Sequence, residues 1–253
     1  MLTRKQFHKF KELVYKECGI NLHEGKRQLL NARLAKRLRS TGVNSVDQYQ
    51  RILEKDDNEL INFINAVSTN HTYFFRENHH FKYLNKDQHN IWCAASSSGE
   101  EPYSIAMYCQ EKGFRPDILA TDISTKVLSK GEAGVYPIEK AEKVPVTILK
   151  RCFKKGHGKW DGYIKLKESV KKMVTFRRFN LLTDFPPTQE FDVIFCRNVM
   201  IYFDTAVKER VINKLYTALK ANGYFIIGGA ESLTNLNHKF KYIRPSIYMK
   251  VLS

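Results

Sequence analysis

The spacing of apolar residues divides this chain into a helical first part and a longer part in which strands and helices alternate. Within residues 1–67, apolar side chains recur three or four positions apart, as at Phe7, Phe10 and Val14, which is typical of amphipathic helices. From residue 90 onward, short apolar runs alternate with helical patterns. This order indicates an α/β fold with a doubly wound, mostly parallel sheet.

The same patterns predict four parts of the chain. We expect an N-terminal helical domain at 1–67, a connecting segment at 68–89 that contributes to an active site, and a sheet domain at 90–253. Inside the last part, the lysine-rich stretch 137–173 breaks the alternation, so we interpret it as an inserted β subdomain. Its glycine-rich segment 156–163 predicts a hairpin tip.

Local sequence signals predict where several helices and strands begin. Ser45 through Gln48 fits a capping box at the start of the third helix. Asn222-Gly223 predicts a turn that leads into a strand. The predicted strands lie at 91–95, 117–122, 163–166, 173–179, 191–196 and 224–227, with final antiparallel strand material in 242–251.

The stretch Asn90–Met107 carries the first chemical signal, because an apolar strand breaks at a turn and a helix follows. The turn has one glycine, where a dinucleotide site needs several, and two acids, Glu100 and Glu101. Two carboxylates suit a cation such as the ammonium or sulfonium group of S-adenosylmethionine (AdoMet). Alternatively, both acids complement the helix dipole. Asp122 ends the next strand, where it suits ribose hydroxyls or caps a helix.

The segment between the two parts is polar, then aromatic, then charged. Its polar residues Asn70, Thr72 and Arg76 are candidates for a pocket, while the alternative is a linker whose phenylalanines pack for stability. The histidines nearby have no convincing metal partners in the sequence, so we expect no metal site.

The charge composition limits the classes of molecule that we expect this protein to bind. Lys plus Arg outnumber Asp plus Glu by 42 to 26, a net charge of +16, which implies nucleic acid, an anionic membrane surface or an acidic protein. Between Lys26 and Arg39 there are six cations and no acid. We interpret this helix as a docking surface, with a solvated face as the alternative, and its candidate docking residues are Arg33, Lys36 and Arg37.

The cysteines and the apolar runs of the sequence predict the cellular location of the protein. The five cysteines are scattered and form no C-x-x-C pair, which is typical of reduced cytoplasmic thiols. We find no apolar run of membrane-spanning length and no signal-peptide pattern. We therefore expect a cytoplasmic protein that does not insert into a membrane.

Taken together, five segments resemble the CheR family of bacterial chemotaxis receptor glutamate O-methyltransferases. They are S-T-N-H-T-Y-F-F-R-E (68–77), S-G-E-E-P-Y-S-I-A-M (98–107), A-T-D-I-S (120–124), F-C-R-N-V-M-I-Y-F (195–203) and G-G-A-E-S-L (228–233), in family order. The resemblance implies a Rossmann-like AdoMet-dependent methyltransferase sheet. The implied activity forms methyl esters on receptor glutamates for sensory adaptation, with S-adenosylhomocysteine as the second product.

The resemblance also implies roles for individual residues. Glu101 would meet the methionine end of AdoMet, with Glu100 as a second candidate, and Asp122 would bind the ribose. Asn180 and Leu181 correspond to the adenine-side pair. The implied catalytic residues are Arg76, which would hold a carboxylate, and Tyr202, near the transferred methyl. The implied cofactor-binding set is Asn70, Thr72, Arg76, Glu101, Asp122, Asn180, Leu181, Arg197 and Asn198.

The implied partners are methyl-accepting chemotaxis receptors, which are long helical bundles with acidic modification sites. In some relatives, the inserted subdomain holds a peptide at the receptor's C-terminus by adding a strand to a sheet edge. The net charge favours one alternative, a nucleic-acid methyltransferase, but the sequence has no N-P-P-Y segment and no Pro-Cys nucleophile. We therefore do not expect nucleic acid as the partner. A non-catalytic AdoMet-dependent binding module is the other alternative.

Overall fold

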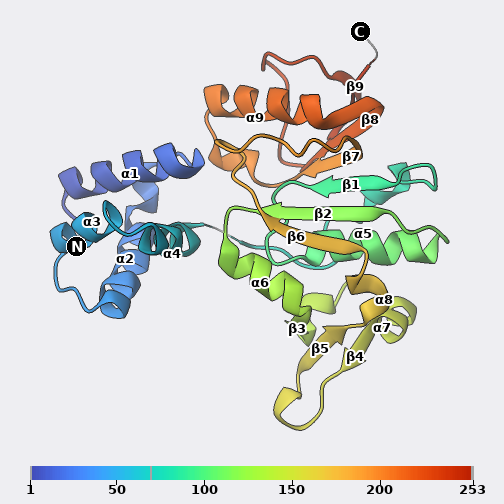
Figure 1. Ribbon diagram of the computed structural model, residues 1–253, viewed down its shortest axis with the longest axis horizontal. Coiled ribbons are helices and arrows are strands. Elements are labelled where there is room, and N and C mark those ends of the chain that lie inside the picture. The colour runs from blue at the N-terminus through green and yellow to red at the C-terminus, as the bar shows by residue number, and fades with distance from the viewer. Residues whose placement is uncertain (1, 69, 252–253) are drawn as a thin grey trace.

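Four helices at the N-terminus lie beside a seven-stranded sheet (Figure 1). A computed structural model describes residues 2–68 and 70–251. The helical domain consists of α1 (Arg4–Cys18), α2 (Arg27–Thr41), α3 (Val46–Leu53) and α4 (Asp57–Val67), with a 3-10 turn at Glu24–Lys26 before α2.

The apolar stripe predicted for α1 forms the centre of the helical domain. Phe7, Phe10 and Val14 are buried, and the Phe10 ring lies 5.5 Å from that of Phe63 in α4. Thr3 begins α1 with a full capping box. Ser45 caps α3 by accepting the N–H of Gln48. Helices α1, α3 and α4 therefore begin at side chains that satisfy free N–H groups, whereas α2 follows the 3-10 turn without a side-chain cap.

The main sheet has the strand order β6-β2-β1-β7-β8-β10-β9. Its first five strands pair in parallel and its last two are antiparallel, which confirms the predicted fold class. The strands are β1 (Asn90–Cys93), β2 (Asp117–Asp122), β6 (Val174–Arg178), β7 (Phe191–Cys196), β8 (Leu219–Ile227), β9 (Lys241–Arg244) and β10 (Ile247–Met249).

Helices cover both faces of this sheet, which is why its central strands are apolar throughout. Ile91 and Cys93 of β1 belong to the core shared with α5 (Glu100–Glu111). Trp92, between them, points to the opposite core, which includes residues of α9 (Thr205–Ala218). Shorter helices, α6 (Thr125–Ala133), α7 (Val146–Cys152) and α8 (Glu168–Lys171), complete the layers.

The predicted turn at Asn222-Gly223 before a strand is wrong. Strand β8 begins at Leu219, directly after α9, and runs through both residues. Its register with β7 shifts after Leu219, and Asn222 has a φ of 61°. A Cβ on Gly223 would lie 2.9 Å from the Asp192 carbonyl oxygen. The pair therefore forms an irregularity inside the strand.

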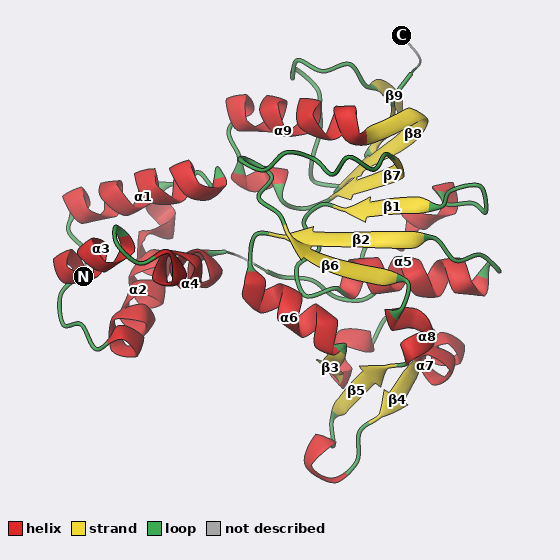
Figure 2. Cartoon of the chain, viewed as in Figure 1, coloured by secondary structure: helices red, strands yellow, loops and turns green. Residues whose placement is uncertain are grey.

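The inserted segment forms a separate three-stranded antiparallel sheet, as predicted (Figure 2). Its order is β3-β5-β4, from β3 (Val135–Pro137), β4 (Phe153–Lys155) and β5 (Tyr163–Leu166). Strands β4 and β5 pair on either side of the predicted hairpin tip. No helix in the described part of the chain is long and apolar enough to cross a membrane.

Candidate active site

A cavity of about 260 Å³ lies at the carboxyl ends of the parallel strands. The arrows of β1 and β2 point toward the helical domain (Figure 1), and the cavity walls come from both sides of that junction. Eight residues proposed from the sequence line it together: Asn70, Thr72, Arg76, Glu101, Asp122, Arg197, Asn198 and Tyr202.

The other two proposed cofactor residues, Asn180 and Leu181, line an adjoining hollow of about 60 Å³. Both spaces share Asp122 and Ile123 in their walls. The Asn180 amide donates to the Glu17 carbonyl at 2.7 Å, and its oxygen accepts the Leu182 N–H at 2.9 Å. Its side chain therefore joins α1 to the sheet domain, and the hollow is lined mainly by apolar groups.

The turn after β1 closes one end of the cavity. Ser97 and Gly99 have φ values of 49° and 92°, and a Cβ on Gly99 would lie 2.9 Å from Phe176. The Asp122 carboxylate holds this turn, because one oxygen accepts the Ser97 N–H and the other accepts the Ser124 N–H, both at 2.9 Å. Each oxygen keeps a lone pair for a further donor, which suits two neighbouring hydroxyls.

The two glutamates at the start of α5 point in different directions, as consecutive helical residues do. Glu101 faces the cavity and pairs with Arg197 at 2.6 Å. Glu100 is fully buried, accepts from the Ser98 hydroxyl at 2.7 Å and lies 3.3 Å from the Lys140 ammonium. Glu100 therefore has partners away from the cavity and does not line it, which favours Glu101 for the methionine end.

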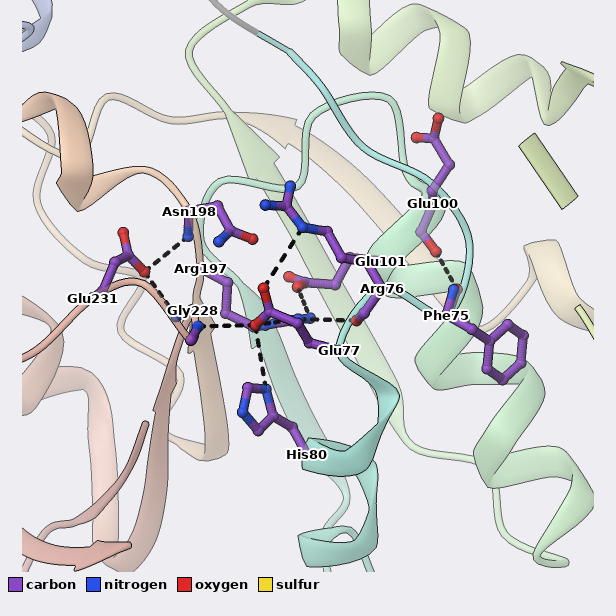
Figure 3. A network of polar contacts seen from close by, with 12 residues as sticks. Phe75, Arg76, Glu77, His80, Glu100, Glu101, Arg197, Asn198, Gly228 and Glu231 are labelled. Atoms are coloured by element: carbon purple, nitrogen blue, oxygen red, sulfur yellow. Dashed lines mark hydrogen bonds and ion pairs between the residues drawn. The ribbon is translucent and has the colours of Figure 1, made fainter. Parts of the chain in front are cut away.

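Arg197 occupies the centre of a buried polar network (Figure 3). Its side chain is only 2% exposed, and it pairs with Glu101 at 2.6 Å and with Glu77 at 3.0 Å. It also donates to the Arg76 carbonyl at 2.9 Å. One guanidinium thus fixes the first turn of α5 and the linker segment against each other.

The charges of this network follow from burial and pairing. Burial raises the pKa of the Glu101 carboxyl, and Arg197 offsets this only in part. Burial also raises the pKa of Glu77, but Arg197 and the Gly229 N–H outweigh it, so that pKa lies below its ordinary value. Burial lowers the pKa of His80 to about 4, so His80 is neutral at physiological pH.

The two proposed catalytic residues come from separate elements and meet at the cavity. Arg76 is 27% exposed, donates to the His71 carbonyl at 3.0 Å and lies 3.7 Å from Glu77. Tyr202 ends a 3-10 turn after β7, and its carbonyl accepts the Asn21 N–H at 2.8 Å. A guanidinium and a phenol therefore share one wall with the cofactor residues.

Sequence reasoning missed the part of the wall that follows α1. The missed lining residues are Ile20, Asn21, Leu22, His23, Lys26 and Leu29. They lie in the connection and first turn of helices that we interpreted as a docking module alone. No motif marks them, because their role depends on how the helical domain packs against the sheet.

Two of the three predicted docking residues are engaged inside the helical domain. Arg33 donates to the Ala66 carbonyl, and Arg37 pairs with Glu59, which is 5% exposed. Both arginines therefore already have partners within the helical domain. Lys36 is exposed, and the docking role of all three residues stays a prediction.

The groups in the two spaces fit AdoMet. Glu101 and Arg76 are placed for the ammonium and carboxylate of an amino acid, Asp122 for a ribose, and the hollow beside Leu181 for an apolar ring. Within residues 2–68 and 70–251, no group of three or more metal-ligating side chains is found.

Comparison with known families agrees with this geometry. Residues 70–249 match the family model described as "CheR methyltransferase, SAM binding domain". Residues 5–68 match "CheR methyltransferase, all-alpha domain". The chain belongs to the CheR methyltransferase family. It is therefore an AdoMet-dependent methyltransferase.

Relatives within the CheR family align over nearly the whole chain. "Chemotaxis protein methyltransferase 2" of Pseudomonas aeruginosa is 39% identical, covering 97% of this chain and 93% of the relative. The chemotaxis protein methyltransferase of Borreliella burgdorferi is 37% identical, covering 98% and 95%. That of Escherichia coli is 35% identical, covering 98% and 91%.

Proposed function

We propose that this protein transfers the methyl group of AdoMet to glutamate side chains of chemotaxis receptors. The product is a methyl ester, which removes a negative charge from the receptor and resets signalling in sensory adaptation. The observation that carries the proposal is a single cavity in which acids suited to AdoMet lie beside Arg76 and Tyr202. The names of the relatives support the receptor as substrate.

Different residues of the chain bind different parts of AdoMet. Glu101 accepts hydrogen bonds from the ammonium group, and Asp122 accepts from the two ribose hydroxyls. The hollow beside Asn180 and Leu181 takes the adenine ring. When bound, AdoMet supplies a methyl group on a positively charged sulfur, which departs as the neutral thioether of S-adenosylhomocysteine.

The substrate needs orientation more than activation. A glutamate with an ordinary pKa of about 4.3 is already ionised at neutral pH, so no general base is required. Arg76 holds a carboxylate by paired hydrogen bonds, and Tyr202 orients the accepting oxygen in line with the methyl carbon. Exclusion of water from the cavity raises the reactivity of that carboxylate.

The exposed cations of α2 and the turn before it support docking of an acidic receptor helix. Lys26, Lys36 and Arg39 are exposed, and Lys26 also lines the cavity. The proposal predicts that Lys36→Glu slows association with receptor and weakens its salt dependence. Lys86→Glu is the matched control, since Lys86 is exposed and precedes the amino end of β1, whereas the cavity lies at the carboxyl ends of the strands.

The inserted subdomain supports a second contact with the receptor. One side of its sheet carries a groove of about 360 Å³ lined by Trp160, Tyr163 and the lysines 154, 155 and 165. Such a groove suits a tail peptide with aromatic and acidic side chains that pairs with an edge strand. Calorimetric titration with receptor tail peptides tests this, and Trp160→Ala should weaken the binding.

Methyl transfer itself is tested with tritiated AdoMet. Receptor-containing membranes should accept label, and mild base should release it as methanol, as expected for a carboxyl ester. Label in tRNA or DNA would instead support a nucleic-acid methyltransferase. AdoMet binding without transfer to any of these would identify a binding module. The proposal also places the reaction in the cytoplasm, where the five free cysteines stay reduced.

A further inference from the structure

The segment G-G-A-E-S-L at 228–233 contributes none of its side chains to the wall of the cavity. It nevertheless contacts the segment 197–202, which carries five cavity residues on irregular backbone: Arg197, Asn198, Val199, Ile201 and Tyr202. Within that segment, Asn198 has a φ of 60°. An L-residue in this conformation needs surrounding contacts to hold it.

Glu231 supplies those contacts. One carboxylate oxygen accepts the N–H groups of Asn198 at 2.8 Å and Gly228 at 2.7 Å. The other accepts the N–H groups of Met200 at 2.8 Å and Ile201 at 3.3 Å. A carboxylate has about four acceptor positions, so this one is fully used on backbone donors. Figure 3 shows Glu231 between Asn198 and Gly228.

The side chains of Asn198 and Glu231 leave little room at position 228. A Cβ on Gly228 would lie 2.4 Å from the side-chain nitrogen Nδ2 of Asn198 and 2.9 Å from the Glu231 carboxylate. A larger residue at position 228 would therefore displace one of these side chains.

A second carboxylate completes the arrangement. Glu77 accepts the Gly229 N–H at 2.9 Å and pairs with Arg197. Two acids thus join the two segments. Glu231 accepts from Gly228 and Asn198, while Glu77 contacts Gly229 and Arg197, the residues next to them. Glu77 fixes the cofactor side of the segment, and Glu231 fixes the stretch that leads to Tyr202.

We propose that Glu231 is a positioning residue for methyl transfer, acting through the backbone of residues 198–201 to place Tyr202. This inference rests on the proposed function, because it assigns Tyr202 a part in orienting the acceptor. It predicts that loss of Glu231 affects turnover more than AdoMet binding. Asn198 is the one proposed cofactor residue that Glu231 contacts, while Glu101, Arg197 and Asp122 are held by other contacts.

The test uses Glu231→Gln, which replaces one acceptor oxygen by a donor and leaves two N–H groups without a partner. Turnover at saturating AdoMet should fall about 10-fold, no more than the loss of the Tyr202 hydroxyl itself costs, while the dissociation constant for AdoMet, measured by calorimetry, should change about threefold or less. Glu231→Asp keeps the charge but has a shorter side chain, so its turnover should lie between those of the wild type and Glu231→Gln. Glu209→Gln is the matched control. The Glu209 carboxylate also accepts a backbone N–H, that of Asn237 at 2.8 Å, but Glu209 does not line the cavity.

A double-mutant cycle with Tyr202→Phe identifies the route. If Glu231 acts through Tyr202, Glu231→Gln should cost much less in the Tyr202→Phe background. Additive effects, unchanged turnover in Glu231→Gln, or an equal loss of AdoMet binding would each overturn the proposal.

Amide hydrogen exchange separates this proposal from the proposed function. Residues 198–201 should lose protection in Glu231→Gln and keep it in Glu209→Gln, whatever the substrate is. If the wild-type protein methylates no receptor, the proposed function fails while this measurement still decides the positioning role. Unchanged protection in Glu231→Gln would refute the positioning role even if receptor methylation is found.

Discussion

Replacing Arg197 by methionine tests the central network most directly. Methionine keeps most of the side-chain length but removes the charge that joins Glu101 and Glu77. Arg197 is 2% exposed and makes contacts of 2.6 and 3.0 Å to these carboxylates. The variant therefore leaves two acids close together without their shared cation.

Breaking a buried ion pair by removing one partner costs about 3–5 kcal/mol. For a chain of this size, each kcal/mol corresponds to a fall in Tm of about 2–4 °C. We therefore expect Arg197→Met to unfold about 6–20 °C below the wild-type protein at neutral pH. Arg115→Met is the matched control, because Arg115 is exposed in the loop before β2, and its Tm should stay near that of the wild type.

The pH dependence gives a second check with a definite sign. The pKa of Glu77 is lowered in the folded protein, so its contribution to stability is present above its unfolded pKa and is lost as pH falls. The pKa of Glu101 is raised, so this acid disfavours folding as pH rises. Arg197 lowers both pKa values, and without it both acids protonate at higher pH.

The difference in Tm between wild type and Arg197→Met should therefore shrink from about pH 7.5 to about pH 5, as the unpaired acids become neutral. Calorimetric unfolding of both proteins across this range measures it. A difference that stays constant with pH, or a Tm within about 2 °C of the wild type at neutral pH, would refute the reasoning.

Further predictions concern the cavity and its supports. Arg76→Ala should lower turnover at saturating AdoMet about 100-fold or more, because the carboxylate that Arg76 holds, that of the acceptor or of the methionine moiety, loses its orientation, and near wild-type turnover would contradict that role. Tyr202→Phe should cost about 10-fold in the same assay, the worth of one hydrogen bond. Asp122→Asn should raise the calorimetric dissociation constant of AdoMet about 10- to 100-fold, because its amide opposes an N–H donor. Gly131→Ala should destabilise the protein by about 1–3 kcal/mol in urea unfolding, since the new Cβ would lie 2.5 Å from the Phe176 ring.

The sequence predicted the strands of the parallel sheet well because their burial leaves a direct mark. The predicted strands 91–95, 117–122 and 191–196 are short, mostly apolar runs that lead into polar residues. They form β1, β2 and β7, although β1 already ends at Cys93, and all three lead to the cavity. The prediction of a turn at Asn222-Gly223 was wrong because local residue preference was overridden by contacts with another part of the chain. Its residues are typical of turns, but the backbone hydrogen bonds of both residues with Lys250, directly after β10, keep them within a strand.

Side-chain direction and long-range pairing were the parts that sequence patterns could not supply. Adjacent glutamates at 100 and 101 look alike in the sequence, and only packing decides which one faces the cavity. Arg37 looks like a surface cation, yet its partner Glu59 lies 22 residues away on another helix. Glu77 and Glu231 were missed because their main contacts join segments far apart in the chain.

The wall that the connection after α1 contributes to the cavity has a thermodynamic consequence. Ile20, Asn21 and Lys26 close the space in which a ligand would sit, while α2 presents exposed cations to the outside. A macromolecule that shifted these helices would alter the affinity for the small molecule within. By reciprocity, the small molecule would then alter the affinity for the macromolecule by the same factor. Through this wall, loading with donor and capture of a target would be energetically linked.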